Sequence, residues 1–106
     1  MEIWETSVFT KQITQLMTDA QYKELQSVLV LNQNVGDVIR HSGGLRKLRW
    51  RIPGSGKRGG IRVIYYNVTG DTILMLFAYK KNQVADLTRD QVDVLRQMSK
   101  SFSPKR

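Results

Sequence analysis

The stretch LRKLRWRIPGSGKRGGIRVIYY, residues 45–66, holds two strand patterns on either side of a glycine-rich segment. Side chains that alternate at period two point to opposite faces of a β-strand, and the first part of the stretch sorts into two such sets. One set is mainly apolar and contains Arg46, Leu48, Trp50 and Ile52. The other set is mainly basic and contains Leu45, Lys47, Arg49 and Arg51. We therefore predict a strand over residues 45–52, a loop over 53–60 and a second strand over 61–68.

The flanking sequence predicts helices before this hairpin, and a strand and a helix after it. Thr18 and Gln21 have the spacing of a capping box, in which a threonine starts a helix, and Thr88 and Gln91 repeat that spacing. The run TILMLFAYKK is apolar on both faces, which is typical of a central strand. The expected elements are a strand over 2–9, a helix from residue 10, a helix over 18–32, a connector over 36–44, strands over 45–52, 61–68 and 72–81, and a helix over 88–102.

Helices followed by a meander of strands predict an α+β fold in a single domain that spans residues 1–106. We expect an N-terminal strand and two helices, an antiparallel sheet of consecutive strands and a C-terminal helix, with the helices on one face of the sheet. The other face is expected to be open and to carry Lys47, Arg49 and Arg51 side by side.

The composition narrows the classes of function. The 106-residue chain carries a formal net charge of +8 and has a pI near 10.1, so we expect an anionic partner, with nucleic acid ahead of a membrane surface. It has no cysteine and one histidine, His41, which excludes disulfides, thiolate metal sites, multi-histidine metal sites and a catalytic histidine pair. No metal or cofactor is expected. The first residues carry acids where a signal peptide is basic, and no run approaches the roughly 20 apolar residues of a membrane span, so a cytoplasmic protein is expected.

The loop GSGKRG, residues 54–59, matches the G-x-G-x-x-G pattern, but a strand follows it where a dinucleotide site requires a helix. A P-loop is excluded as well, because Arg58 follows the lysine where serine or threonine is required. The glycines allow Lys57, Arg58 and nearby main-chain amides to approach phosphates. An ordinary solvated hairpin loop accounts for the same residues equally well, and both interpretations stay open.

The basic row favours anion binding over a merely solvated sheet face. Like charges side by side on one strand cost stability, and no acid lies between Asp37 and Asp71. Arg62 begins the next strand, where it is expected to lie across the sheet from the row. One of Lys80 and Lys81, at the end of the third strand, is expected to share the basic face.

Aromatic residues lie next to these cations in the sequence. Tyr65, Tyr66 and Tyr79 have rings on which the bases of single-stranded nucleic acid can stack. Packing in the core or at its rim is the alternative. That alternative is strong for at least one of Tyr65 and Tyr66, because adjacent residues of a strand face opposite ways.

A crowded cationic site can cut RNA without paired histidines or carboxylates. The 2′-hydroxyl must lose a proton, the phosphorane must be stabilised and the 5′-oxygen must gain a proton. Neighbouring positive charge lowers the pKa of a lysine, which can then act as a base, and an arginine can hold the phosphate with two parallel hydrogen bonds. This chemistry needs no metal, and it acts on RNA because DNA lacks the attacking hydroxyl.

The order of elements, together with GGLRKLRWR, GKRGGIRVIYY and LFAYKKNQVADLT, resembles the RelE/HigB superfamily of bacterial type II toxins, most closely the HigB-like branch, over about residues 20–98. The resemblance implies a RelE-like fold in a single toxin domain. It also implies a toxin that enters the ribosomal A site, contacts 16S ribosomal RNA and cleaves translated mRNA without a metal. A cognate antitoxin, of a helix-turn-helix, HigA-like kind, is implied as the protein partner.

The resemblance extends to individual positions. The residues that match the family's basic positions are Lys47, Arg49, Lys57, Arg58, Arg62 and Lys81. Two departures stand out: Lys80 replaces a glycine that is frequent in relatives, and Leu87 replaces a tyrosine that some relatives are proposed to stack on a base. Tyr79 is then the candidate for stacking or proton donation.

The leading hypothesis is a ribosome-dependent, metal-independent mRNA endoribonuclease that inhibits translation. Arg62 would stabilise the phosphorane, Lys47 would be the candidate base, and Arg49 and Lys81 would position the phosphate or donate the leaving proton. The further RNA contacts are assigned to Arg51, Lys57, Arg58, Tyr79 and Lys80. The alternatives are a non-catalytic nucleic-acid-binding module that uses the same face, and an interaction protein whose basic face docks an acidic protein.

Overall fold

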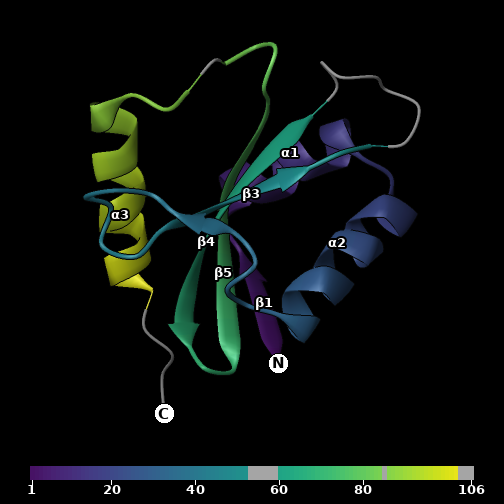
Figure 1. The fold of residues 1–106 in the computed structure, drawn as a ribbon, viewed down its shortest axis with the longest axis horizontal. Helices are drawn as coiled ribbons and strands as arrows, with labels where there is room; N and C mark the ends of the chain where they lie inside the picture. The colour runs from purple at the N-terminus through teal and green to yellow at the C-terminus, as the bar shows by residue number, and fades with distance from the viewer. Residues whose placement is uncertain (53–59, 85, 103–106) are drawn as a thin grey trace.

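The fold follows the predicted α+β order, with one additional short strand (Figure 1). A computed structural model describes residues 1–52, 60–84 and 86–102. The elements are β1 (Glu2–Glu5), α1 (Ser7–Leu16), α2 (Asp19–Leu31), β2 (Asp37–Val38), β3 (Arg46–Trp50), β4 (Ile61–Thr69), β5 (Thr72–Lys80) and α3 (Arg89–Ser101). None of the helices in these residues is long and apolar enough to cross a membrane.

The helices begin where threonine side chains accept hydrogen bonds from the main chain. Capping boxes at Thr18 with Gln21 and at Thr88 with Gln91 are both present, as the sequence predicts. The expected strand over residues 2–9 is too long, however. Thr6 caps α1 by accepting a hydrogen bond from the amide of Phe9, so the helix starts at Ser7 instead of Thr10.

The strands form one mixed sheet in the order β1-β5-β4-β3-β2. The expected antiparallel meander is present in β3, β4 and β5. Two details of the sheet differ from the prediction. β1 pairs parallel with β5, and the connector over 36–44 contains β2, whose two residues are too few to show a strand pattern.

Helices cover both faces of the sheet, so the expectation of helices on one face and an open second face is wrong. Figure 1 shows α2 on one side of the sheet and α3 on the other. Helices α1 and α2 pack on the face that holds Leu48, Val63 and Met75. Helix α3 packs on the opposite face, because apolar side chains also point there. These residues are Leu45, Ile64, Leu74, Leu76, Tyr79 and Leu95.

A β-bulge in β5 decides which residues at the end of that strand face α3. Ile64 pairs with Phe77, but the next residue of β4 pairs with Met75, so Leu76 is the extra residue of β5. Leu76 and Phe77 consequently belong to the same apolar cluster against α3. The shift turns Tyr79 toward α3 and Lys80 toward the face of α1 and α2.

Polar contacts hold β2 beside β3. The Tyr65 hydroxyl donates a hydrogen bond of 2.7 Å to the carbonyl oxygen of Gln33 and accepts one of 2.9 Å from the amide of Gly36. Arg46 donates from Nη1 to the carbonyl oxygen of Gly36 at 2.7 Å. Burial raises the pKa of Tyr65, which keeps its hydroxyl a donor. Arg46 is thus a structural residue that anchors the segment before β2.

The loop between β2 and β3 lies against α3. His41, Gly43 and Gly44 all have positive φ angles there, of 58°, 74° and 102°. A Cβ at Gly43 would come within 2.9 Å of Nε of Arg96 on α3, so the close approach requires glycine. The loop and α3 together wall off one side of the sheet.

Candidate functional site

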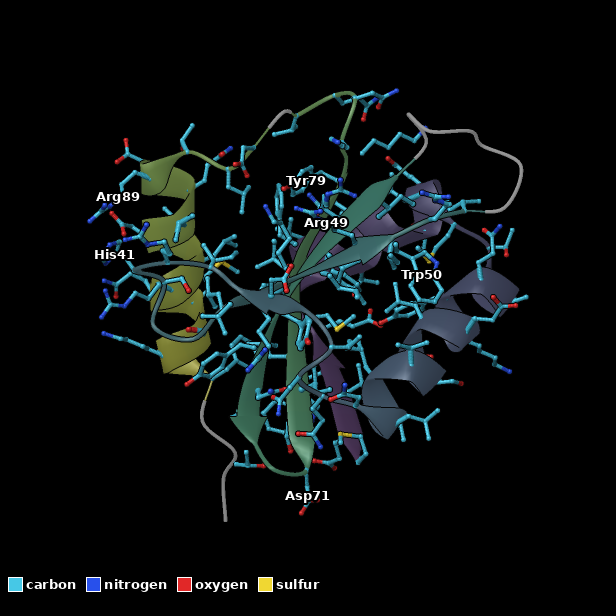
Figure 2. The ribbon with its side chains drawn as sticks, in the orientation of Figure 1. His41, Arg49, Trp50, Asp71, Tyr79 and Arg89 are labelled. Atoms are coloured by element: carbon cyan, nitrogen blue, oxygen red, sulfur yellow. The ribbon has the colours of Figure 1, made fainter. Side chains whose placement is uncertain are left out.

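Two arginines and a tyrosine form a row across β3, β4 and β5 on the α3 face. Arg49 pairs with Arg62, and Arg62 pairs with Tyr79. Figure 2 shows Arg49 and Tyr79 over the middle of the sheet. Directly opposed like charges destabilise a sheet, and neither arginine forms an ion pair within the described residues. This row therefore costs stability that a bound anion can recover.

A groove of about 530 Å³ lies beside this row, between the β2–β3 hairpin and the start of α3. Its size falls in the range of about 300–1,000 Å³ that is typical of pockets for small ligands. The groove is lined by Asp37, Val38, Ile39, Arg40, Lys47, Arg49, Asp86, Leu87, Arg89 and Val92. Its cations come from β3, from the loop after β2 and from α3.

Two carboxylates enter this basic groove, although no acid lies between Asp37 and Asp71 in the sequence. Asp86 Oδ1 lies 3.5 Å from Nζ of Lys47. Asp37 pairs with Lys47 across β2 and β3 and lines the same groove. Both acids are distant from Lys47 along the chain, so only the fold brings them together. The Asp86 side chain is 75% exposed, which makes the ion pair weak and easily displaced by another anion.

Tyr79 is buried next to the groove. Burial raises the pKa of its hydroxyl, the negative charge of Asp86 raises it further, and Arg62 opposes the shift. The hydroxyl therefore stays protonated well above neutral pH and acts as a hydrogen-bond donor. Tyr79 is thus influenced both by Asp86, which lines the groove, and by Arg62, which belongs to the arginine row.

Gly60 makes room for the guanidinium of Arg62. A Cβ at Gly60 would lie 3.1 Å from Nη1 of Arg62, so a side chain there would shift the guanidinium by a few tenths of an ångström. Among the described residues, Nη1 of Arg62 makes only a long contact of 3.4 Å to the carbonyl oxygen of Ile61. The amide of Lys81 donates to the carbonyl oxygen of Gly60 at 3.0 Å, which places the main chain of Lys81 level with Gly60, two residues beyond Tyr79 along the chain.

The fold gathers some of the predicted site residues and separates others. Lys47, Arg49, Arg62 and Tyr79 come together, and the main chain of Lys81 lies beside them. Lys80 faces away, since it pairs with Ile61 of the opposite apolar cluster. Arg51 follows the end of β3 and is exposed. Lys57 and Arg58 lie outside the described residues.

The tyrosines of β4 serve packing. Tyr65 is fully buried in the cluster under α1 and α2, so it has no face for a base. Tyr66 packs against the cluster under α3. Tyr79 alone of the three tyrosines considered lies in the arginine row.

The sequence did not reveal Arg40, Arg89, Asp37 and Asp86 as groove residues. Arg40 and Asp37 belong to a segment whose strand is only two residues long. Arg89 carried one local signal: it is the first residue of α3, where a positive side chain opposes the helix dipole. Among the described residues, no group of three or more His, Asp or Glu side chains is placed to hold a metal ion.

Comparison with protein families agrees with this fold. The family model described as RelE toxin of the RelE / RelB toxin-antitoxin system matches residues 1–105. The chain therefore belongs to the RelE toxin family.

Proposed function

Starting from a toxin of the RelE family, we propose that this protein is an endoribonuclease that cleaves mRNA in the ribosomal A site and so inhibits translation. The observation that carries the proposal is the Arg49–Arg62 pair, in which arginines of adjacent strands lie opposite each other in the sheet register without an ion pair among the described residues. A phosphodiester is the anion that such a pair can hold with parallel hydrogen bonds.

The reaction is a transesterification within the RNA. The 2′-oxygen attacks the neighbouring phosphorus, the bond from phosphorus to the 5′-oxygen breaks, and the products are a 2′,3′-cyclic phosphate and a 5′-hydroxyl. One proton leaves the 2′-hydroxyl and one joins the 5′-oxygen, so the reaction is balanced without a redox partner. Charge builds on the non-bridging oxygens in the transition state, and preorganised cations are most effective at that point.

We assign the roles from position in the row. Arg62 is half-buried and central, so it stabilises the phosphorane. Arg49, directly across from it, orients the same phosphate. Lys81, which follows the row two residues after Tyr79, is the candidate for proton donation to the 5′-oxygen, and Tyr79 supplies a hydrogen bond from its protonated hydroxyl.

Lys47 is the candidate base, and its neighbours set a condition on that role. The ammonium of Lys47 is paired with Asp86 in the free protein. An incoming phosphate competes with Asp86 for this ammonium. To act as a base, Lys47 must also lose a proton to solvent before it accepts the proton of the 2′-hydroxyl. Arg51, Lys57 and Arg58 are proposed to contact the RNA outside the reacting phosphate.

The partners and compartment follow from the family. We propose a cognate antitoxin, of the helix-turn-helix, HigA-like kind, together with ribosomal RNA contacts and a cytoplasmic location in one toxin domain. The charge of +8 fits both an acidic antitoxin and an RNA surface.

The test is cleavage of a message on translating ribosomes. The unmodified protein should leave fragments with 5′-hydroxyl ends, and Arg62→Ala should cut at least about 100-fold more slowly, the effect typical of losing one group that stabilises the transition state. Lys23→Ala, which removes an exposed cation on α2, should cut at the normal rate. Normal cutting by Arg62→Ala, with its melting temperature unchanged, would contradict the assignment.

A non-catalytic RNA-binding module is the second candidate. The Lys47–Asp86 pair favours it, because Lys47 is an ammonium in this pair. An ammonium can bind a phosphate but cannot accept a proton. Binding to ribosomes with an intact message would support this module and exclude the nuclease.

A further inference from the structure

The groove is longer than a single reacting phosphate requires. Along β3 the reacting end lies at Arg49, and Lys47 follows at about 7 Å by twice the rise per residue. On β2, Asp37 is level with Lys47, and the amide of Ile39 donates to the carbonyl oxygen of Leu45. The groove continues past that point, and its wall there includes Arg40.

Arg89, the first residue of α3, also lines the groove. Figure 2 shows Arg89 in the first turn of α3 and Arg49 over the sheet. Both residues line the groove, so they belong to opposite walls of one depression. Neither Arg40 nor Arg89 forms an ion pair within the described part of the chain.

The position of Arg89 is unfavourable for the helix. A cation in the first turn opposes the helix dipole. Asp90, the next residue, carries the negative charge that the helix dipole favours in this turn. The arginine therefore lowers the stability of α3 slightly, as the opposed Arg49 and Arg62 lower that of the sheet.

The Lys47–Asp86 pair stands between these two cationic ends. Asp86 is on the connector before α3 and neutralises Lys47, which lies between Arg49 and the level of Arg40 along the strands. The groove thus holds three arginines without ion pairs among the described residues. Arg49, which is paired in the sheet register with Arg62, lies on one side of Lys47 along the strands, and Arg40 lies on the other side, in the groove that Arg89 also lines.

We propose that Arg40 and Arg89 form a second phosphate subsite, which holds the phosphodiester next to the reacting one on the same RNA strand. The proposal rests on the proposed function, because it takes the Arg49–Arg62 end as the reacting site. A bound strand then spans the groove, and its second phosphate fixes the register of the first. With this subsite, the affinity of the protein depends on the length and direction of the RNA strand as well as on its charge.

Short oligonucleotides test the subsite without cleavage. The probes are a 2′-deoxy dinucleotide with one phosphodiester and a 2′-deoxy trinucleotide with two, neither of which has the attacking hydroxyl. The unmodified protein should bind the trinucleotide about tenfold more tightly, as expected for one additional charge-assisted contact. Arg40→Gln and Arg89→Gln should lose that gain and bind the dinucleotide normally. Lys23→Gln is the matched control and should change neither affinity.

The outcomes separate the subsite from the nuclease. Equal trinucleotide affinity in the unmodified protein and in both arginine variants would overturn the subsite, and so would an equal loss for both oligonucleotides. An intact message on ribosomes would instead overturn the nuclease and leave the oligonucleotide result standing. Because Arg40 and Arg89 are exposed, both variants are expected to fold, and their melting temperatures check this.

Discussion

The two faces of the sheet differ in whether the side chains of β3 are buried or paired. On the face of α1 and α2, the side chains of β3 are either buried, as Leu48 is, or bonded to the main chain, as Arg46 is. On the face of α3, the alternate residues of the same strand begin with buried Leu45 and then leave Arg49 without a partner among the described residues. At these positions of β3, Arg46 and Leu48 contribute stability, whereas Arg49 gives up stability for the capacity to bind an anion. The contrast is built within a single strand.

The largest expected effect compares adjacent residues on the two faces. Leu48 is only 6% exposed, so Leu48→Ala should lower the free energy of unfolding by about 2–4 kcal/mol through lost burial and a cavity. Arg49→Ala should change it by less than about 0.5 kcal/mol, or raise it slightly, because it relieves repulsion from Arg62. Urea unfolding measures both. If Arg49→Ala lost as much stability as Leu48→Ala, the contrast between the faces would be wrong.

The next effect concerns room for the reacting arginine. Gly60→Ala should slow message cleavage about tenfold, equivalent to about 1.4 kcal/mol, since its methyl group would displace the Arg62 guanidinium. Its melting temperature should change little. Gly70→Ala is the matched control, because no atom lies within 4 Å of a Cβ at Gly70. Equal cleavage by the two variants would show that Gly60 does not position Arg62.

Alkaline pH should lower the stability of the protein through tyrosines on both faces of the sheet. Burial raises the pKa of Tyr22, Tyr65 and Tyr79, and hydrogen bonding to Glu5 adds to the shift at Tyr22. Groups whose pKa is raised by folding stabilise the protein fully below their unfolded pKa, near 10 for tyrosine, and that stabilisation is lost as the pH rises through the folded pKa. The free energy of unfolding should therefore fall above about pH 10, by up to about 1.4 kcal/mol per pH unit for each proton concerned.

Tyr22→Phe should make that alkaline decline shallower, because it removes one of these protons. Urea unfolding at a series of alkaline pH values measures the slope. An unchanged slope would mean that Tyr22 does not contribute to the decline.

The smallest effect concerns the Lys47–Asp86 pair. Asp86→Asn should change stability by less than about 1 kcal/mol, because the carboxylate is mostly exposed. It should raise the affinity for a 2′-deoxy oligonucleotide a few-fold, with the gain fading at high salt. The expected gain comes from freeing Lys47 and removing a negative charge from the groove. Weaker binding by Asp86→Asn would show that Asp86 supports the RNA site instead of competing with it.

Local patterns were sufficient for much of the fold. Capping boxes at Thr18 and Thr88 and the alternation in β3 predicted where α2, α3 and the basic row lie. The start of α1 was misplaced, because Thr6 ends β1 and caps the helix within a run that reads as strand. That α3 covers the second face depends on packing between residues far apart in the sequence, which no local pattern predicts.

The candidate site was predictable only in part, for two physical reasons. Arg49 and Arg62 were expected to be neighbours, and the register confirms that they are. The bulge at Leu76 then exchanges the faces to which Tyr79 and Lys80 point. The sequence does not indicate such a one-residue shift, because β5 is apolar on both faces and has no alternation to interrupt. Asp86 enters the groove from a loop, so its contact with Lys47 follows from the tertiary fold alone.

The salt dependence of binding to a single-stranded 2′-deoxy oligonucleotide tests the central claim most directly. If Arg49 and Arg62 hold one phosphate together, each of Arg49→Ala and Arg62→Ala should reduce the steepness of log K against log salt by about 0.7, the value for one phosphate contact on a single strand. The double variant should then match either single variant, since both remove the same phosphate. Slopes equal to that of the unmodified protein in all three variants would contradict the convergence of these side chains on an RNA phosphate.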